Sequence, residues 1–248
     1  MLYPTTLPGW LFFLARSLLV TLWFFVVSFL LLLIAFFRPF SYKNGILFCR
    51  WLSPMALFLL GIKIEFRNVE KATSHQPCIF IGNHQHLIDL FAYSYTLSDR
   101  TITLGKQSIR WIPIFGWLYW LSGQVLIDRS NNERAVATLL KAKERLERER
   151  LSLFIFPEGT RSRGRPLGPF KKGAFHMALS TKFNLVPVVA TDYFRFLNLG
   201  KLHSGTIVME ALDPISIEGK TADQIMAESR EIILKATERL NAEQATLR

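Results

Sequence analysis

The first 60 residues hold two apolar segments of different length. In the first, residues 17–37, no residue is charged. As a helix rising ~1.5 Å per residue, this segment approaches the ~30 Å thickness of a bilayer's hydrocarbon core. The second, residues 46–60, is shorter and is interrupted by Arg50 and Pro54, which favours a helix lying in the membrane interface. We therefore expect residues 1–60 to form a membrane-embedded helix pair that anchors the chain.

After residue 60, short apolar runs alternate with segments in which apolar residues recur at helical spacing. Such alternation of strands and helices is typical of a mostly parallel sheet. We expect residues 61–248 to form an α/β domain, with a central sheet of about seven strands flanked by helices. Strands are predicted at 61–67, 78–81, 101–104, 124–127, 151–156, 186–189 and 206–209, and helices from about 89, from 130 or 131, and at 221–240.

The formal net charge of +11 predicts an anionic partner, either nucleic acid or a phospholipid surface. The apolar N-terminal segment favours the membrane, because a nucleic-acid-binding protein has no use for it. Arg38, Lys43 and Arg50 follow the first apolar run and would lie against anionic headgroups. More basic residues follow that run than precede it, which indicates a cytoplasmic location for the rest of the chain. We expect a cell-membrane protein with no nucleic-acid partner.

Candidate chemistry begins at the end of the predicted strand 78–81, where the chain reads Gly82-Asn83-His84. Ligands of α/β folds gather at the carboxyl ends of strands, so His84 is well placed for chemistry. Asp89 follows five residues later. The two side chains would not share a face of an unbroken helix, but a turn between them lets the carboxylate reach the imidazole. A histidine held by a carboxylate is a general-base arrangement.

Other interpretations of this histidine remain open. A single His-x4-Asp pair is also typical of an ordinary hydrogen-bonded histidine. His84 and His86 together could be two metal ligands of a membrane hydrolase, although the other three histidines are scattered and the two cysteines lack ligand spacing. A non-catalytic anchor that binds anionic membranes is a further alternative.

A cationic segment follows the predicted strand 151–156. Between residues 161 and 172 there are five positive charges and no acid. Ordinary solvation explains Arg163 and Arg165 equally well. Arg161 differs, because it closes the turn Pro-Glu-Gly-Thr-Arg, in which Gly159 can free backbone N–H groups to face an anion and the guanidinium can grip a phosphate. Lys106 and Arg129 also end predicted strands, so three cations could converge on one anionic group.

Four motifs in this order resemble those of the glycerolipid acyltransferase family. They are Asn83-His84-x4-Asp89, the GQVLIDR segment ending at Arg129, the FPEGTRS segment of residues 156–162, and Val186-Pro187-Val188. Together they span roughly residues 78–190 and are far more specific than any one alone. Within the family, the chain is most similar to bacterial lysophosphatidic acid acyltransferases, which also carry a membrane-associated helix pair. One departure is His86, where the family usually has Ser.

The resemblance implies an acyltransferase domain at residues 61–248 that makes phosphatidic acid. A fatty acyl group would move from acyl-CoA or acyl-carrier protein to the sn-2 hydroxyl of 1-acylglycerol-3-phosphate, with glycerol-3-phosphate or another lysophospholipid as alternative acceptors. The implied location is the bacterial inner membrane. His84 would be the base and Asp89 its orienting carboxylate. The implied acceptor-site residues are Lys106, Arg129, Glu158, Gly159, Thr160 and Arg161.

The sequence also bears on whether the acyl group passes through a covalent acyl-enzyme. An alcohol does not ionise at neutral pH, so a base must take its proton as it attacks the thioester. We find no G-x-S-x-G motif and no cysteine close to a histidine-bearing motif. We therefore expect direct transfer without an acyl-enzyme, and neither a metal nor a cofactor beyond the thioester co-substrate.

Overall fold

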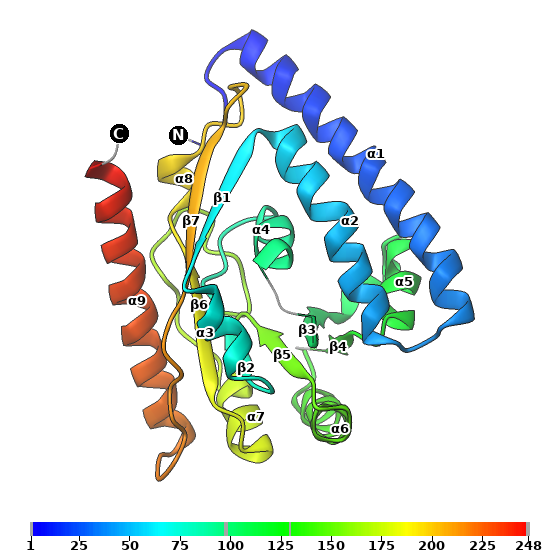
Figure 1. Cartoon of the computed structure of the whole chain (residues 1–248), viewed down its shortest axis with the longest axis vertical. Helices are drawn as coiled ribbons and strands as arrows, with labels where there is room; N and C mark the ends of the chain where they lie inside the picture. Colours follow the sequence, from blue (N-terminus) through cyan, green and yellow to red (C-terminus); the bar gives the residue numbers. More distant parts are fainter. Residues whose placement is uncertain (1, 97–98, 129, 247–248) are drawn as a thin grey trace.

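The computed structural model describes residues 2–96, 99–128 and 130–246, and its centre is a seven-stranded sheet in the order β1-β7-β6-β2-β5-β3-β4 (Figure 1). Every pair of neighbouring strands is parallel except β6 and β7. The predicted mostly parallel sheet is therefore confirmed, with β1 and β7 running against the other five strands. The strands are β1 (Ile62–Arg67), β2 (Ile79–Ile81), β3 (Thr101–Lys106), β4 (Val125–Ile127), β5 (Ser152–Ile155), β6 (Leu185–Ala190) and β7 (Gly205–Ala211).

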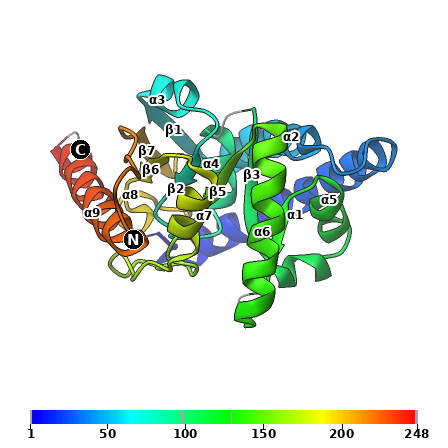
Figure 2. The same ribbon diagram turned by 90° about the horizontal axis from the view of Figure 1, so that it is seen from below.

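Helices cover both faces of the sheet, and Figure 2 shows the C-terminal helix on one side of the strands and the two N-terminal helices on the other. On one face lie α1 (Leu7–Phe37), α2 (Tyr42–Leu60), α4 (Asp89–Thr96) and α5 (Phe115–Leu121). On the other face lie α6 (Asn132–Glu149), α7 (Gly173–Thr181) and α9 (Ala222–Thr246). Three shorter elements, α3 (Val69–Ser74), the 3₁₀ helix η1 (Gln107–Trp111) and α8 (Tyr193–Phe196), complete the set among the described residues.

Alternation along the strands separates two hydrophobic cores. On β2, Phe80 packs in the core beneath α1 and α2, whereas Ile79 and Ile81 pack in the core beneath α6, α7 and α9. Successive side chains of a strand point to opposite faces, so a continuous apolar run serves both cores at once. The central strands are therefore buried on both sides.

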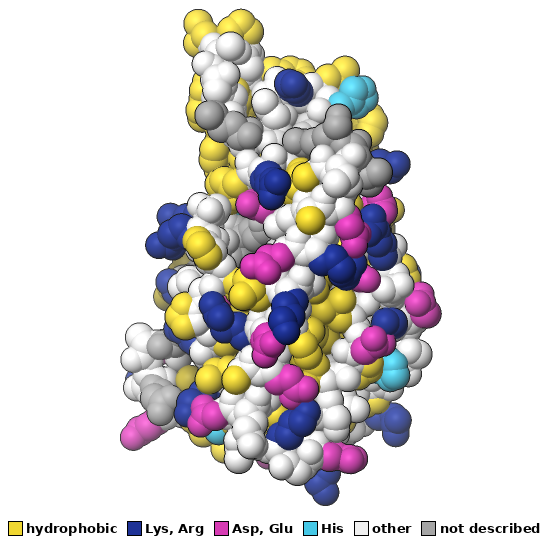
Figure 3. Space-filling view, turned by 90° about the vertical axis from the view of Figure 1, so that its left-hand side faces the viewer, with side chains coloured by type: hydrophobic (Ala, Val, Ile, Leu, Met, Phe, Trp, Pro, Cys, Tyr) yellow, Lys and Arg dark blue, Asp and Glu magenta, His cyan; other side chains and the backbone are white. Residues whose placement is uncertain are grey.

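The outer surfaces of the two helical layers differ in character. On the side of α9, acidic and basic side chains are interspersed, as Figure 3 shows. On α1, by contrast, the exposed side chains are large and apolar, among them Leu11, Leu18, Leu33 and Phe37. Among the described helices, α1 is the one that is long and apolar enough to cross a membrane.

The predicted helix pair is present, but each helix starts earlier than its apolar run. The side chain of Thr6 accepts a hydrogen bond from Gly9 N at 3.3 Å and caps α1, and Pro8 lies in the first turn, where its missing N–H costs no hydrogen bond. Pro54 lies inside α2, and the helix continues to Leu60. The start of α1 therefore coincides with its cap and not with the loss of charge, whereas Ser41, before α2, makes no capping hydrogen bond with its side chain.

Arg16 is a charged residue within the apolar helix α1, and its charge is accommodated by hydrogen bonds to backbone carbonyls. Its side chain is buried, and its guanidinium donates hydrogen bonds to Leu59 O at the end of α2, to Lys201 O at 2.7 Å and to Leu202 O at 3.4 Å. The last carbonyls of a helix lack partners within the helix. Arg16 supplies one, and it ties both helices to the segment before β7.

Replacing Arg16 by Met keeps a long side chain but removes these donors. We expect a lower free energy of unfolding, because each buried carbonyl left without a donor costs about 1–3 kcal/mol. Thermal denaturation in detergent measures the change as a lower Tm. Arg148→Met is the matched control, since the side chain of Arg148 is 69% exposed and its loss should leave the Tm nearly unchanged. Equal Tm values for the two variants would contradict the role of Arg16.

Candidate active site

The carboxyl ends of β2, β5 and β6 lie side by side, because the three strands are parallel and β2 is in the middle. Asn83, immediately after β2, fixes this edge. Its side-chain amide donates to Ala190 O and its carbonyl oxygen accepts from Ala190 N, both at 2.9 Å, and the same oxygen accepts from the Tyr93 hydroxyl at 2.8 Å. Asn83 thus joins β2 to β6 and to α4 before the chain reaches His84.

The predicted contact between His84 and Asp89 is present. His84 Nδ1 lies 2.6 Å from Asp89 Oδ2. The same oxygen accepts hydrogen bonds from Gln85 N at 2.7 Å and His86 N at 2.9 Å. The chain therefore turns around one carboxylate oxygen, and this turn is what brings a residue five positions away back to the imidazole.

The orientation of the imidazole is fixed on a second side by Phe156. The two rings are stacked, with centroids 4.0 Å apart and planes 10° apart. The side chain of His84 is 18% exposed and that of Asp89 1%. With Nδ1 directed at the carboxylate, Nε2 is the free nitrogen, and no group among the described residues hydrogen-bonds to it. The arrangement can take a proton at Nε2.

Glu158 holds the two loops of the site together. Its Oε1 accepts a hydrogen bond from His84 N at 2.7 Å, and its Oε2 accepts one from Gly168 N at 3.0 Å. Burial raises the pKa of this carboxyl, although the two N–H groups act in the opposite direction. The family resemblance implied an acceptor-site role for Glu158, and both of its oxygens have backbone partners.

The turn after Glu158 brings Arg161 alongside the histidine segment. Gly159 has a positive φ of 68°, a conformation that side chains with a Cβ disfavour, and Thr160 is exposed. Two backbone hydrogen bonds then pair the turn with the histidine segment, from Ser162 N to His84 O at 2.8 Å and from Arg163 N to Gln85 O at 3.1 Å. Arg161 is half-buried, and its Nε is buried with no hydrogen-bond partner among the described residues.

The other two predicted cations are less directly placed. Lys106 ends β3 on the same edge of the sheet and is exposed. In the strand order β5 separates β3 from β2, so two strand spacings, about 10 Å, lie between them. Arg129 lies outside the described residues.

Two residues of the site were not singled out from the sequence. Gln85 is buried. Its side chain donates a hydrogen bond to Thr191 O at 2.9 Å and accepts one from Tyr193 N at 3.1 Å. The Tyr193 hydroxyl is buried, and burial first, then the negative charge of Asp89, raises its pKa. Gln85 stands beside a candidate base in the sequence, which was a usable signal; Tyr193 offered none.

His86 also has protein partners. Its Nε2 lies 2.8 Å from the Tyr3 hydroxyl, and its Nδ1 accepts a hydrogen bond from Ile88 N at 3.4 Å. His84 and His86 therefore each have a ring nitrogen engaged with a protein group. In the described part of the chain, no three His, Cys, Asp or Glu side chains are grouped so that they could hold a metal ion.

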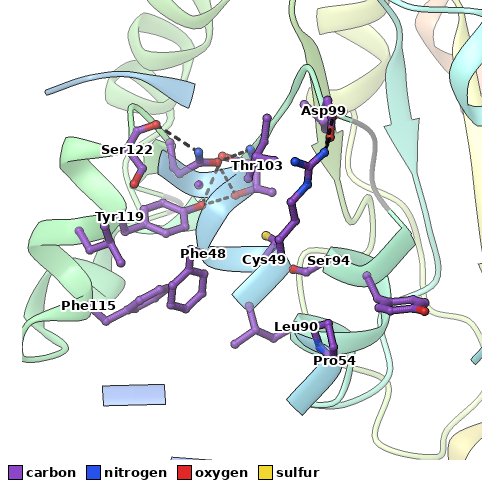
Figure 4. A pocket seen from close by; sticks show the side chains of 17 residues that line it. Phe48, Cys49, Pro54, Leu90, Ser94, Asp99, Thr103, Phe115, Tyr119 and Ser122 are labelled. Atoms are coloured by element: carbon purple, nitrogen blue, oxygen red, sulfur yellow. Dashed lines mark hydrogen bonds and ion pairs between the residues drawn. The ribbon is translucent and has the colours of Figure 1, made fainter. Parts of the chain in front are cut away.

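A cavity of about 360 Å³ lies next to α4, between α2, α5 and the start of β3 (Figure 4). Apolar side chains such as Phe48, Leu90 and Leu118 line it. Several of its polar groups bond to one another: Gln124 Oε1 accepts from Thr103 N at 2.8 Å, and the hydroxyls of Thr103 and Tyr119 are 2.8 Å apart. The Ser122 hydroxyl is buried with no hydrogen-bond partner among the described residues. The apolar part of the lining suits a hydrocarbon.

Comparisons with known proteins identify the family of the chain. The family model described as "Acyltransferase" matches residues 63–191. The 1-acyl-sn-glycerol-3-phosphate acyltransferase of Haemophilus influenzae is 41% identical over 67% of this chain and 70% of its own length, and that of Escherichia coli is 42% identical over 67% and 68%. The crystal structure of the 1-acyl-sn-glycerophosphate acyltransferase from Thermotoga maritima superposes with a TM-score of 0.72 at 22% identity, covering 93% of this chain and 98% of that one, which supports the fold. The chain is an enzyme and belongs to the acyltransferase family, with the 1-acyl-sn-glycerol-3-phosphate acyltransferases as its relatives.

Proposed function

We propose that the enzyme transfers a fatty acyl group from an acyl thioester, acyl-CoA or acyl-carrier protein, to the sn-2 hydroxyl of 1-acylglycerol-3-phosphate, forming phosphatidic acid. The observation that carries this proposal is the 2.6 Å contact between His84 Nδ1 and Asp89 Oδ2, in a segment whose backbone is hydrogen-bonded to the turn that carries Arg161. The names of the bacterial relatives support the same acceptor.

His84 acts as general base and then as general acid. Its Nδ1–H donates to Asp89, so the lone pair on Nε2 accepts the proton of the acceptor hydroxyl as the oxygen attacks the thioester carbonyl. The tetrahedral intermediate collapses as the carbon–sulfur bond breaks. The protonated imidazole then returns its proton to the thiolate. Both halves of the transfer occur in one ternary complex, and the chain's part is positioning and proton transfer.

Arg161 binds the acceptor's phosphate, helped by Lys106 and Arg129. A guanidinium can form two parallel hydrogen bonds to a phosphate, and the buried Nε of Arg161 without a protein partner supports this role. Gly159 and Thr160 form the turn that presents it. Glu158 acts through the backbone of His84 and Gly168, as a positioning residue.

The exposed face of α1 is embedded in the membrane, so the lipid acceptor can reach the active site without leaving the bilayer. Support comes from the apolar side chains of α1, and from Trp111 and Trp117, which are 76% and 69% exposed beside it on η1 and α5. Tryptophan is favoured at the level of lipid headgroups. Two of the basic residues expected at the headgroups have protein partners: Arg38 donates to Asn44, and Arg50 pairs with Asp99 at 2.6 Å. The cytoplasmic orientation and the boundary at residue 60 remain predictions.

The cavity beside α4 holds a fatty acyl chain, most simply that of the donor. Leu90, the residue after Asp89 on α4, is part of its lining, so the same helix contributes to the cavity and to the catalytic pair. Each CH₂ group that it buries contributes about 0.8 kcal/mol. Its depth then determines which chain length is transferred best.

His84→Ala and Asp89→Asn should fold yet transfer poorly. Removing the base should lower kcat about 10²–10⁴-fold, and Asp89→Asn should also reduce it, because an amide does not stabilise a protonated imidazole. Thiol release from acyl-CoA with lysophosphatidic acid as acceptor measures both, with circular dichroism to check the fold. His176→Ala, at an exposed histidine on α7, is the control. A wild-type rate in His84→Ala would refute the assignment.

Arg161→Ala should raise the KM for lysophosphatidic acid by roughly 10–100-fold, since a hydrogen bond to a charged group contributes about 1.5–3 kcal/mol. The preference for lysophosphatidic acid over monoacylglycerol, which lacks the phosphate, should fall by a similar factor. Lys172→Ala is the matched control from the same cationic segment, because Lys172 is ion-paired with Asp223 at 2.8 Å. An unchanged preference in Arg161→Ala would remove Arg161 from the phosphate site.

Ile46→Phe narrows the cavity and should shift the optimum donor to shorter chains. Two carbons that no longer fit should reduce kcat/KM for the longer donor roughly tenfold, while the KM for lysophosphatidic acid stays unchanged. A series of acyl-CoA donors of increasing length measures the shift. Ile34→Phe is the matched control, because Ile34 is exposed on α1. The same chain-length profile in both variants would show that the cavity does not hold the transferred chain.

A further inference from the structure

The segment before α1 reaches the candidate active site. Leu2 is buried, and its carbonyl accepts a hydrogen bond from Leu199 N at 2.8 Å. This contact holds the next residue, Tyr3, over His86. The Tyr3 ring stacks with Trp10 at a centroid distance of 6.1 Å and meets the His86 ring edge-on at 6.0 Å. The N-terminal segment is thus part of the wall of the site.

The hydrogen bonds of His86 determine which way the Tyr3 hydroxyl points. His86 Nδ1 accepts from Ile88 N, so in the neutral ring the proton is on Nε2. Burial is the largest influence on the pKa of His86 and lowers it; the negative charge of Asp89 acts in the opposite direction, and the positive charges of Arg161 and Arg163 lower the pKa further. The neutral ring is therefore the form at pH 7. Its Nε2–H donates to the Tyr3 oxygen, 2.8 Å away, and the hydroxyl proton of Tyr3 remains available for another acceptor.

The surroundings of the Tyr3 hydroxyl include positively charged residues, which suit an anion, and an apolar helix, which suits a hydrocarbon chain. Arg161 and Arg163 influence His86 electrostatically, and their turn is hydrogen-bonded to the backbone of His84 and Gln85. Tyr3 is 38% exposed and lies just before the apolar helix α1. A lysophospholipid has a phosphate at one end, which suits the arginines, and a hydrocarbon chain at the other, which suits the apolar helix.

We propose that the Tyr3 hydroxyl, oriented by His86, donates a hydrogen bond to the phosphate of the lysophospholipid acceptor. This inference rests on the proposed function and adds two residues to it. Tyr3 would be a binding residue that touches the substrate, and His86 a positioning residue that acts through Tyr3. The proposal also assigns a role to His86, which stands where the family usually has serine.

The test is the kinetics of Tyr3→Phe, which keeps the stacked ring and removes only the hydroxyl. We expect the KM for lysophosphatidic acid to rise about tenfold, as for loss of one hydrogen bond to a charged group, with kcat and the KM for acyl-CoA unchanged. Tyr42→Phe is the matched control, since Tyr42 lies at the first residue of α2 beside Arg100. An unchanged KM in Tyr3→Phe, or a loss confined to kcat, would overturn the proposal.

Variants of His86 separate orientation from packing. His86→Ala should raise the KM as Tyr3→Phe does, and the double variant should be no worse than either single one, because both remove the same hydrogen bond. His86→Gln can place an amide N–H near the former Nε2, and we expect it to restore most of the affinity. Additive effects, or no recovery with Gln, would overturn the role of His86. If the wild-type enzyme transferred nothing to lysophosphatidic acid, the proposed function would fall and this inference with it.

Discussion

The site depends on one carboxylate oxygen, Oδ2 of Asp89. It accepts hydrogen bonds from the ring of His84 and from the backbone of Gln85 and His86. A buried carboxylate is costly unless donors surround it, so the chain between the two residues must wrap around it. The same wrapping that supplies donors to Oδ2 also orients the imidazole, while Oδ1 is buried with no hydrogen-bond partner among the described residues. The spacing of four residues between His84 and Asp89 is therefore a requirement of the turn as well as of the chemistry.

The sheet supplies the rigid base on which this turn rests. Asn83 connects the end of β2 to β6, and Glu158 connects His84 to the segment around Gly168. Each of these polar side chains is buried with its partners satisfied, an arrangement that favours a unique geometry. The loops from β2 and β5 are consequently held by hydrogen bonds and not by the packing of their exposed side chains. The backbone pairing of the Arg161 turn with the histidine segment belongs to the same network.

Much of this was predictable because it is local. A buried strand followed by Asn83-His84, and a carboxylate five residues on, identify the turn, and apolar runs identify the strands. The reversed direction of β7 was not predictable, since its apolar run resembles that of any other strand and carries no sign of direction. The contact of Tyr3 with His86 joins residues 83 positions apart, and no spacing rule connects them. Similarly, the motif contains Glu158 but does not show that both of its oxygens face backbone N–H groups.

The attachment of Arg16 to the end of α2 and to the segment before β7 has a mechanical consequence. If α1 could move relative to the rest of the domain, the depth of the active site relative to the membrane surface would vary. Hydrogen bonds from one guanidinium to backbone carbonyls on both sides remove that freedom. With α1 immersed as proposed, the imidazole sits at a set level, and the thickness of the bilayer leaflet decides how far a lipid hydroxyl must rise to meet it.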